Sequence, residues 1–247
     1  MTEVTRAEYC AVACAELFAD AGEIFASPMA TLPLIGARLA KLTTEPDLII
    51  TDGEALILAE APAIGASAPI EGYIPFSKVF DVVASGRRHV VMGANQIDKY
   101  GNQNLSAFGP LDKPTRQMFG LRGAPGNTIN HAPATGSAAF PRVFAEKVDV
   151  VCGVGYDKVD PENPAFRFLK NHAWSPTGRL RLPGPGQTMR AVTLHPGVTA
   201  EDVKANTSFE IADLDSAGVT REPTAEELRL IREVIDPKSL RDREVSA

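Results

Sequence analysis

A short apolar run followed at once by a polar segment constrains the fold of this chain more than any other feature. His89-Val90-Val91-Met92 has the length and composition of a strand that is buried on both faces, which is typical of parallel sheets. Residues 95–104 come next and are mostly amides and charged residues around a single glycine, Gly101. Open parallel sheets bind ligands just beyond the carboxyl ends of their strands. The order of the two segments therefore predicts a parallel sheet with a site at its polar edge.

Four polar side chains of this segment are candidate ligand-binding residues: Gln96, Asp98, Asn102 and Asn104. Amides and carboxylates at a strand end can hold the polar groups of a substrate. The same residue types also bond their own backbone in turns, and spacing alone favours that second interpretation. The residues by themselves leave both interpretations open.

Helical and strand-like segments alternate from the start of the chain. A capping box at Thr5 begins an Ala-rich helix that ends near Gly22, and a strand is predicted at 23–27. A second helix is predicted over 28–42 and a second strand over 46–51. This alternation predicts an α/β protein with an open, mostly parallel, doubly wound sheet.

The chain is long enough for one full core. Its 247 residues, 44% of them hydrophobic, predict a single domain that spans 1–247. Residues 157–187 are rich in proline and glycine and show little periodicity, so we expect an insertion there, anchored by Trp174. Capping boxes at Thr199 and Thr224 predict two further helices near the end of the chain.

Two carboxylates flank a glycine at the end of the strand predicted over 46–51. They are Asp52 and Glu54, on either side of Gly53. An acid in this position can serve as a nucleophile or a general base, because burial and a like-charged neighbour raise its pKa toward neutrality. The alternative is a turn that carries two solvated acids.

A glycine-bracketed loop over 121–130 is a third candidate. Its backbone could pack closely against a ligand and turn N–H groups toward an oxyanion or a phosphate. The candidate binding residues in it are Gly123, Gly126, Asn127 and Asn130. Taken alone, this motif has little specificity.

Composition excludes several classes of function. The net charge of -6 and the dispersed Lys and Arg residues argue against a nucleic-acid surface. No apolar run approaches the roughly 20 residues that span a bilayer, so we expect no membrane association. The first residues lack the cationic and apolar pattern of a secretory signal. We therefore expect an intracellular protein.

The cysteines and histidines do not suggest a metal site. Cys10 and Cys14 lie one helical turn apart, but without a third ligand nearby we interpret them as small buried apolar residues. Cys152 stands alone, and the histidines are scattered. Three cysteines are too few for a disulfide framework, so a reducing, cytoplasmic compartment fits.

Several ordered motifs together identify a family. Residues 95–104 resemble the Gln-Val-Asp-x-x-Gly-Asn-x-Asn signature of the β subunits of class I coenzyme A transferases of the glutaconate type. Further blocks similar to that family's sequence extend over nearly the whole chain: 123–127, 146–149, 155–156, 194–199 and 206–210.

The resemblance implies a class I coenzyme A-transferase fold and a partner. The expected assembly is an α2β2 complex with an α subunit of similar fold. Coenzyme A is expected as part of an acyl-CoA substrate, with no tightly bound cofactor. By the same resemblance, the polar side chains of 95–104 and the loop over 121–130 would bind that substrate.

One departure from the family's pattern is decisive for the expected chemistry. In the transferases a glutamate carries the thioester, but here Asp52 occupies that position and Glu54 replaces a glycine. A branch of the family with this departure opens a carbocyclic ring of a coenzyme A thioester in steroid catabolism by carbon–carbon bond hydrolysis. We expect Asp52 and Glu54 to be the catalytic residues of this chain in such a hydrolase. The principal base belongs either to this chain or to the α subunit.

Two alternatives remain. The chain could be a true coenzyme A transferase subunit that uses Glu54, or a non-catalytic scaffold that completes the partner's site.

Overall fold

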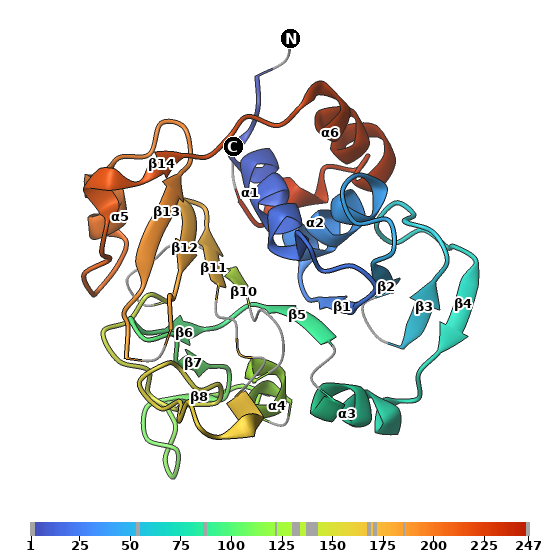
Figure 1. The fold of residues 1–247 in the computed structure, drawn as a ribbon. Helices are drawn as coiled ribbons and strands as arrows, with labels where there is room; N and C mark the ends of the chain where they lie inside the picture. Colours follow the sequence, from blue (N-terminus) through green and yellow to red (C-terminus); the bar gives the residue numbers. More distant parts are fainter. Residues whose placement is uncertain are drawn as a thin grey trace. The chain divides into compact units, whose positions relative to one another are not determined.

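The computed structural model describes residues 3–52, 55–85, 88–121, 123–129, 134–136, 143–166, 169, 172–184 and 186–245. It divides into two compact units (Figure 1). The first unit consists of Met1–Met92 with Thr220–Ala247, and the second is the continuous stretch Gly93–Val219. The expectation of a single domain with an insertion stays a prediction.

The hydrogen-bonded strands of the first unit follow the order β5-β1-β2-β3-β4. At its centre β1 (Phe25–Pro28) pairs in parallel with β2 (Ile49–Thr51) on one side and β5 (Arg88–Met92) on the other. Every residue of β1 and β5 is buried, which confirms the parallel strand predicted from the apolar run. Two antiparallel strands, β3 (Leu56–Leu58) and β4 (Ile70–Tyr73), extend the sheet to its edge.

Helices at both ends of the chain belong to this first unit. The capping box predicted at Thr5 begins α1 (Arg6–Ala15), which continues as η1 (Glu16–Phe18) and packs against α2 (Thr31–Leu42). The remaining helices are α3 (Phe76–Ser85), α6 (Ala225–Arg229), the π-helical η4 (Leu230–Ile235) and η5 (Leu240–Arg243).

Small residues set the close contact of α1 with α2. A Cβ atom added at Gly36 would lie 2.5 Å from the Cβ of Cys14. Cys10 and Cys14 form no disulfide and are fully buried, as expected of small apolar residues. Burial raises the pKa of the Cys10 thiol to about 12, so it stays protonated and unreactive.

The second unit contains five strands with parallel and antiparallel pairings, and two small hairpins. The five strands have the order β14-β13-β12-β11-β10. They are β10 (Ala134–Gly136), β11 (His172–Ser175), β12 (Gly178–Arg181), β13 (Arg190–Leu194) and β14 (Gly218–Val219). The hairpins pair β6 (Gln96–Ile97) with β7 (Gln103–Asn104), and β8 (Ala107–Phe108) with β9 (Arg116–Gln117). Short helices complete the unit: α4 (Ala124–Thr128), η2 (Pro164–Phe166), α5 (Ala200–Ala205) and η3 (Leu214–Ser216).

The segment predicted as a proline- and glycine-rich insertion contains an antiparallel hairpin, β11 with β12. Sequence periodicity missed it because each strand has four residues and β12 alternates arginines with Gly178 and Leu180. Leu180 and Leu182 join the core of this unit together with Phe144 and Met189. The side chain of Trp174, the predicted anchor, lies outside the described residues.

The observed architecture confirms the predicted fold class, an α/β protein with parallel strands at the centre of its sheet. Across the described ranges, no helix has the length and apolar character needed to cross a membrane. Within the same ranges, no group of three or more His, Cys, Asp or Glu side chains is arranged to hold a metal ion.

A buried ion-pair network joins the two ends of the chain in the first unit. The Glu8 side chain is fully buried, and its oxygens accept hydrogen bonds from Arg232 at 2.6 and 2.8 Å and from Arg241 at 3.3 Å. Arg241 also donates to Asp236 at 3.0 Å. The Glu244 carboxylate accepts from the first two N–H groups of α2, at 2.6 and 3.0 Å. These contacts tie the C-terminal helices to α1 and α2.

Replacement of Glu8 by glutamine should destabilise the chain by about 3 kcal/mol, because it removes the fully buried carboxylate that pairs with the half-buried Arg232 and the buried Arg241. Burial raises the pKa of Glu8, but hydrogen bonds from Arg232 and Thr5 and the charges of Arg232 and Arg241 outweigh burial, so the pKa is lowered. Its contribution to stability is therefore complete above the ordinary pKa of 4.5 and is lost as the pH falls through the lowered value.

Urea unfolding between pH 3 and pH 7 measures both effects. Glu226→Gln, which removes an exposed i,i+3 pair with Arg229, is the matched control and should change nothing measurable. Equal losses in the two variants would contradict the assigned role of Glu8.

Candidate functional site

Asp52 follows β2 directly and lies on the surface of the first unit. Its N–H donates to the Leu56 carbonyl at 3.0 Å, and its Oδ1 accepts from the Leu56 N–H at 3.1 Å. The turn between β2 and β3 therefore fixes the position of the carboxylate. Gly53 and Glu54, at the tip of this turn, lie outside the described residues.

Arg38 is a charged neighbour of Asp52. It projects from α2 and is only 3% exposed, and it donates to the carbonyls of Leu34 and Pro62. Burial lowers the pKa of Arg38, and the charge of Asp52 opposes that effect.

Asp52 also belongs to a row of residues that crosses three strands. Thr51 pairs with Ile57 and the Asp52–Leu56 hydrogen bonds extend that ladder, while Leu56 pairs with Tyr73 of β4. Side chains of directly opposed residues stand on the same face of a sheet. Asp52, Leu56 and Tyr73 therefore form one cross-strand row, with the carboxylate at one end and an aromatic ring at the other.

The polar segment 95–104 forms the β6–β7 hairpin of the second unit, with Gly101 in the turn at a φ of 83°. Asn102 uses its entire amide. Its Nδ2 donates to Asp98 at 2.9 Å and to Asp157 at 2.8 Å, and its Oδ1 accepts from the Gly155 N–H at 2.8 Å. The amide thus joins the hairpin to the loop around 155.

Asp98 is held by the same turn. Its Oδ1 accepts from the N–H groups of Tyr100 and Asn102, each at 3.0 Å. Burial raises the pKa of the Asp98 carboxyl above its ordinary value, which hydrogen bonds from Asn102 and Tyr100 partly offset and the charge of Asp157 reinforces.

Gln96 and Asn104 form a second network on the paired strands. Asn104 donates to Gln96 Oε1 at 2.6 Å and to the Ala107 carbonyl at 2.7 Å. Gln96 Oε1 also accepts from the Asp149 N–H at 3.0 Å, and Gln96 Nε2 donates to the Asp149 carboxylate at 3.3 Å. Sequence reasoning missed Asp149 and Asp157 as partners, although Asp149 lies in a block that resembles the family.

The four side chains singled out from the sequence are thus brought together in two groups, each occupied by bonds within the protein. This agrees with the interpretation that they shape turns and loops. Binding of a substrate by Gln96, Asp98, Asn102 or Asn104 stays a prediction.

The glycine-bracketed segment differs from expectation. Instead of an irregular loop, residues 124–128 form the short helix α4, with Gly123 before it and Pro125 in its first turn. Proline is favoured at that place because its missing N–H would have no partner in the helix. Asn127 is buried and Gly126 is half-buried, while Asn130 lies outside the described residues. Coenzyme A binding by this segment stays a prediction.

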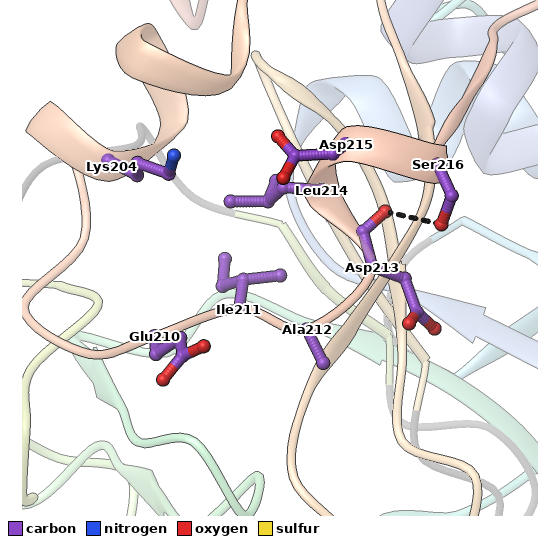
Figure 2. Close-up of a pocket in the computed structure, with 8 residues that line it drawn as sticks. All are labelled: Lys204, Glu210, Ile211, Ala212, Asp213, Leu214, Asp215 and Ser216. Carbon is purple, nitrogen blue, oxygen red and sulfur yellow. Dashed lines mark hydrogen bonds between the residues drawn. The ribbon is translucent and has the colours of Figure 1, made fainter.

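A pocket of about 340 Å³ opens elsewhere in the second unit (Figure 2). Figure 2 shows Leu214 beside Asp215, Ile211 beside Glu210 and Ala212, and the Asp213 carboxylate directed away. Asp213 instead pairs with Arg190, at 2.6 and 2.9 Å. Ser216 donates to the Asp213 carbonyl at 3.2 Å. Among the residues that line this pocket, no nucleophile is paired with a base. None of these lining residues was singled out from the sequence as a catalytic or binding residue.

A neighbouring pocket of about 470 Å³ shares Glu210 and Ala212 with the first and adds Lys99, Glu146 and Ser208. Both pockets lie around the 206–210 block that resembles the family. The resemblance of that block to the family is the sequence signal for these pockets. Its residue types, however, do not predict a catalytic or binding role.

Comparison with protein-family models finds no match. Among curated proteins, the chain is 72% identical over 248 residues to the cholesterol ring-cleaving hydrolase IpdB subunit of Rhodococcus jostii, covering 100% of this chain and 98% of the relative. It is 64% identical over 247 residues to the protein of that name from Mycobacterium tuberculosis, covering 98% of each chain. A glutaconate CoA-transferase subunit of Acidaminococcus fermentans is 27% identical, covering 83% of this chain and 84% of the relative.

Solved structures agree with these relatives. The crystal structure of Rhodococcus jostii IpdAB matches with a TM-score of 0.96 and 71% identity, covering 100% of both chains. Glutaconate coenzyme A-transferase from Acidaminococcus fermentans matches with a TM-score of 0.82 at 24% identity, covering 96% of both chains, which shows the shared class I coenzyme A-transferase fold. The chain therefore belongs to the family of IpdB subunits of the cholesterol ring-cleaving hydrolases.

Proposed function

We propose that this chain is the β subunit of a hydrolase that opens a carbocyclic ring of a coenzyme A thioester in cholesterol catabolism. The observation that carries the proposal is the 72% identity to a ring-cleaving hydrolase subunit over the full length of the chain. The partner is an α subunit of the IpdA type, and the assembly is an α2β2 heterotetramer. The compartment is the cytoplasm.

The residue at the family's catalytic position supports hydrolysis over transfer. Transfer by the family's route needs a glutamate that forms a thioester, whereas Asp52 has one methylene fewer. A displacement of about 1 Å at a reacting atom can cost roughly 100-fold in rate. Asp52 is also held by the Leu56 N–H, which suits a carboxylate that orients water better than one that must reach a thioester.

The reaction can proceed without a covalent carrier. A carboxylate removes a proton from water, and the oxygen of that water bonds to a ring carbonyl carbon. The bond between this carbon and its ring neighbour then breaks, and its electron pair moves to the neighbouring carbon, where an adjacent carbonyl stabilises the charge. That carbon takes up the proton, and the opened ring carries a new carboxylate.

Within this reaction, Asp52 and Glu54 position water or act as the base. The principal base belongs either to this chain or to the α subunit. Gln96, Asp98, Asn102 and Asn104 shape the loops of the site, and the segment from Gly123 to Asn130 contacts the coenzyme A part of the substrate. Coenzyme A enters with the substrate, and no tightly bound cofactor takes part.

A coenzyme A transferase is the second candidate, favoured by the shared fold. In that enzyme Glu54 would form the thioester in an altered register. A scaffold that only completes the partner's site is the third.

Reconstitution tests the proposal directly. The chain alone should have no ring-opening activity, and mixing it with the α subunit should restore turnover, because only one half of the family's motif set is present here. The two should form a stable complex that buries more than about 2,000 Å², as obligate complexes do. Turnover assays measure the ring-opening activity, and light scattering measures the mass of the complex. Full activity of either chain alone would refute the two-subunit proposal.

Asn102→Ala should lower stability and complex yield together with activity. It leaves two carboxylates and the Gly155 N–H without their shared partner, at a cost of about 2 to 4 kcal/mol. Asn206→Ala is the control, because that amide makes one exposed bond to Asp202. Thermal unfolding and size-exclusion yield are the measurements. Normal stability and assembly with selectively lost turnover would show that Asn102 contacts the substrate.

Substitution of Asp52 and Glu54 separates hydrolase from transferase. As water-positioning groups, each should cost 10- to 100-fold in turnover when changed to alanine, equivalent to about 1.4 to 2.7 kcal/mol of barrier, with Asp52 the more sensitive. Asp47→Ala, which removes an exposed acid before β2, is the control. Turnover of the complex is measured alongside mass spectrometry of the β chain. A coenzyme A adduct on Glu54 that vanishes with Glu54→Ala, together with all activity, would establish the transferase instead.

A further inference from the structure

Gln103 carries a side-chain oxygen that the fold buries without a hydrogen bond. The residue lies in β7 and is only 1% exposed, and its Oε1 accepts from no donor among the described residues. The four candidate side chains of the same hairpin, by contrast, all form side-chain hydrogen bonds. A buried acceptor without a donor costs the fold free energy, so native proteins rarely keep one without a reason.

Backbone pairing on both sides fixes the direction of the Gln103 side chain. Gln103 stands opposite Ile97 of β6, and on its other side it exchanges two backbone hydrogen bonds with Gly153, at 2.9 and 3.1 Å. Directly opposed residues place their side chains on the same face. Ile97 is 2% exposed and belongs to the apolar core of this unit, so the Gln103 side chain points toward that core.

The helix α4 covers the same face. Gly153 has no side chain, and a Cβ atom added there would lie 2.2 Å from Cγ2 of Thr128, the last residue of α4. Thr128 is fully buried and therefore occupies the space beside Gln103. Its hydroxyl donates to the Pro125 carbonyl at 3.0 Å, so its one proton is already used within the helix. Gln103 thus lies under the segment that contacts coenzyme A in the proposed function.

The surroundings of the Gln103 oxygen select a class of ligand group. A lone acceptor among apolar side chains suits a mostly apolar ligand segment that carries one hydrogen-bond donor. The carbonyls of the proposed ring and of its thioester are acceptors, so Oε1 cannot bind them. The pantetheine arm of coenzyme A carries two secondary amides, and each presents one N–H between short alkyl segments. The arm is therefore the part of an acyl-CoA whose donors match.

We propose that Gln103 binds the pantetheine arm, its Oε1 accepting a hydrogen bond from one of the two amide N–H groups. Thr128 moves aside as the arm enters. The free chain bears the cost of the unpaired oxygen, and binding of the arm removes that cost. The proposal rests on the proposed function, because it takes a coenzyme A thioester as the substrate. It gives a role to the position that the family's signature leaves open, between Asn102 and Asn104.

Binding of coenzyme A to the complex with the α subunit tests this contact. Gln103→Met keeps the length of the side chain but removes the acceptor, so the Kd of coenzyme A in calorimetric titration should rise about 10-fold. The nucleotide end alone, adenosine 3′,5′-bisphosphate, lacks the arm and should bind both proteins equally. Gln187→Met, the same change at an exposed position of this unit, is the matched control and should leave both affinities unchanged.

A change in the ligand gives a second measurement. A coenzyme A analogue with an ester in place of one pantetheine amide lacks that N–H donor. One of the two such analogues should bind the unmodified complex about 10-fold more weakly than coenzyme A does. The Gln103→Met complex should not distinguish that analogue from coenzyme A, because a contact already lost cannot be lost again.

Stability and turnover provide independent readouts. The thermal midpoint of the free Gln103→Met chain should stay unchanged or rise, because the substitution removes an unpaired buried oxygen. In ring opening, KM should rise with kcat unchanged, since the arm lies outside the reacting ring. If Gln103→Met does not fold, Gln103→Asn withdraws the acceptor by one methylene and serves the same comparisons.

The proposal fails on any of three results. Equal Kd values of coenzyme A for the unmodified and Gln103→Met complexes would show that the arm does not use this oxygen. Loss of association with the α subunit in Gln103→Met would show that the partner chain supplies the donor. Both of these results leave the proposed function standing. An unmodified complex that binds no coenzyme A would refute the contact and the proposed function together.

Discussion

The Asn102 amide is the contact on which the polar half of this structure depends. It supplies two donors and one acceptor: the donors bond to Asp98 within the hairpin and to Asp157, and the acceptor takes the N–H of Gly155, in the same loop as Asp157. A buried amide with this capacity joins two loops with one side chain, and neither a carboxylate nor a hydroxyl offers the same set of bonds. Asn104, in the same hairpin, donates to Gln96 and to the Ala107 carbonyl of β8, and so joins these two segments. A motif with the residue types of a binding site thus acts here as a framework.

The sequence predicts well the features that depend only on residues close together in the chain. The capping boxes at Thr5, Thr199 and Thr224 all form, because each needs only residues three apart. The buried strand β5 follows from its composition. The bounds of β1 and β2 are shorter than predicted, since pairing rather than propensity ends a strand.

Two kinds of feature could not be predicted from the sequence: contacts between residues far apart in the chain, and very short helices and strands. The partners of Gln96 and Asn102 lie 53 and 55 residues away, so no spacing rule points to Asp149 or Asp157. The helix α4 has five residues and the β11–β12 strands four each, too short for periodicity to register. At the candidate catalytic position, the departure from the family's pattern at Asp52 is visible in the sequence. Its Arg38 neighbour became visible only when α2 was placed beside the strand.

The discontinuity of the first unit has a consequence for how the chain is made. Glu8 and the N–H groups that begin α2 emerge from the ribosome early, yet their partners Arg232, Arg241 and Glu244 follow 213 to 233 residues later. The second unit is one continuous stretch that is synthesised between them. Until these three partners have emerged, the Glu8 carboxylate lacks its counter-charges and the start of α2 lacks its carboxylate cap. The segment with these three residues therefore completes a structure that the first helices began, and a truncation before Arg232 acts on the N-terminal core.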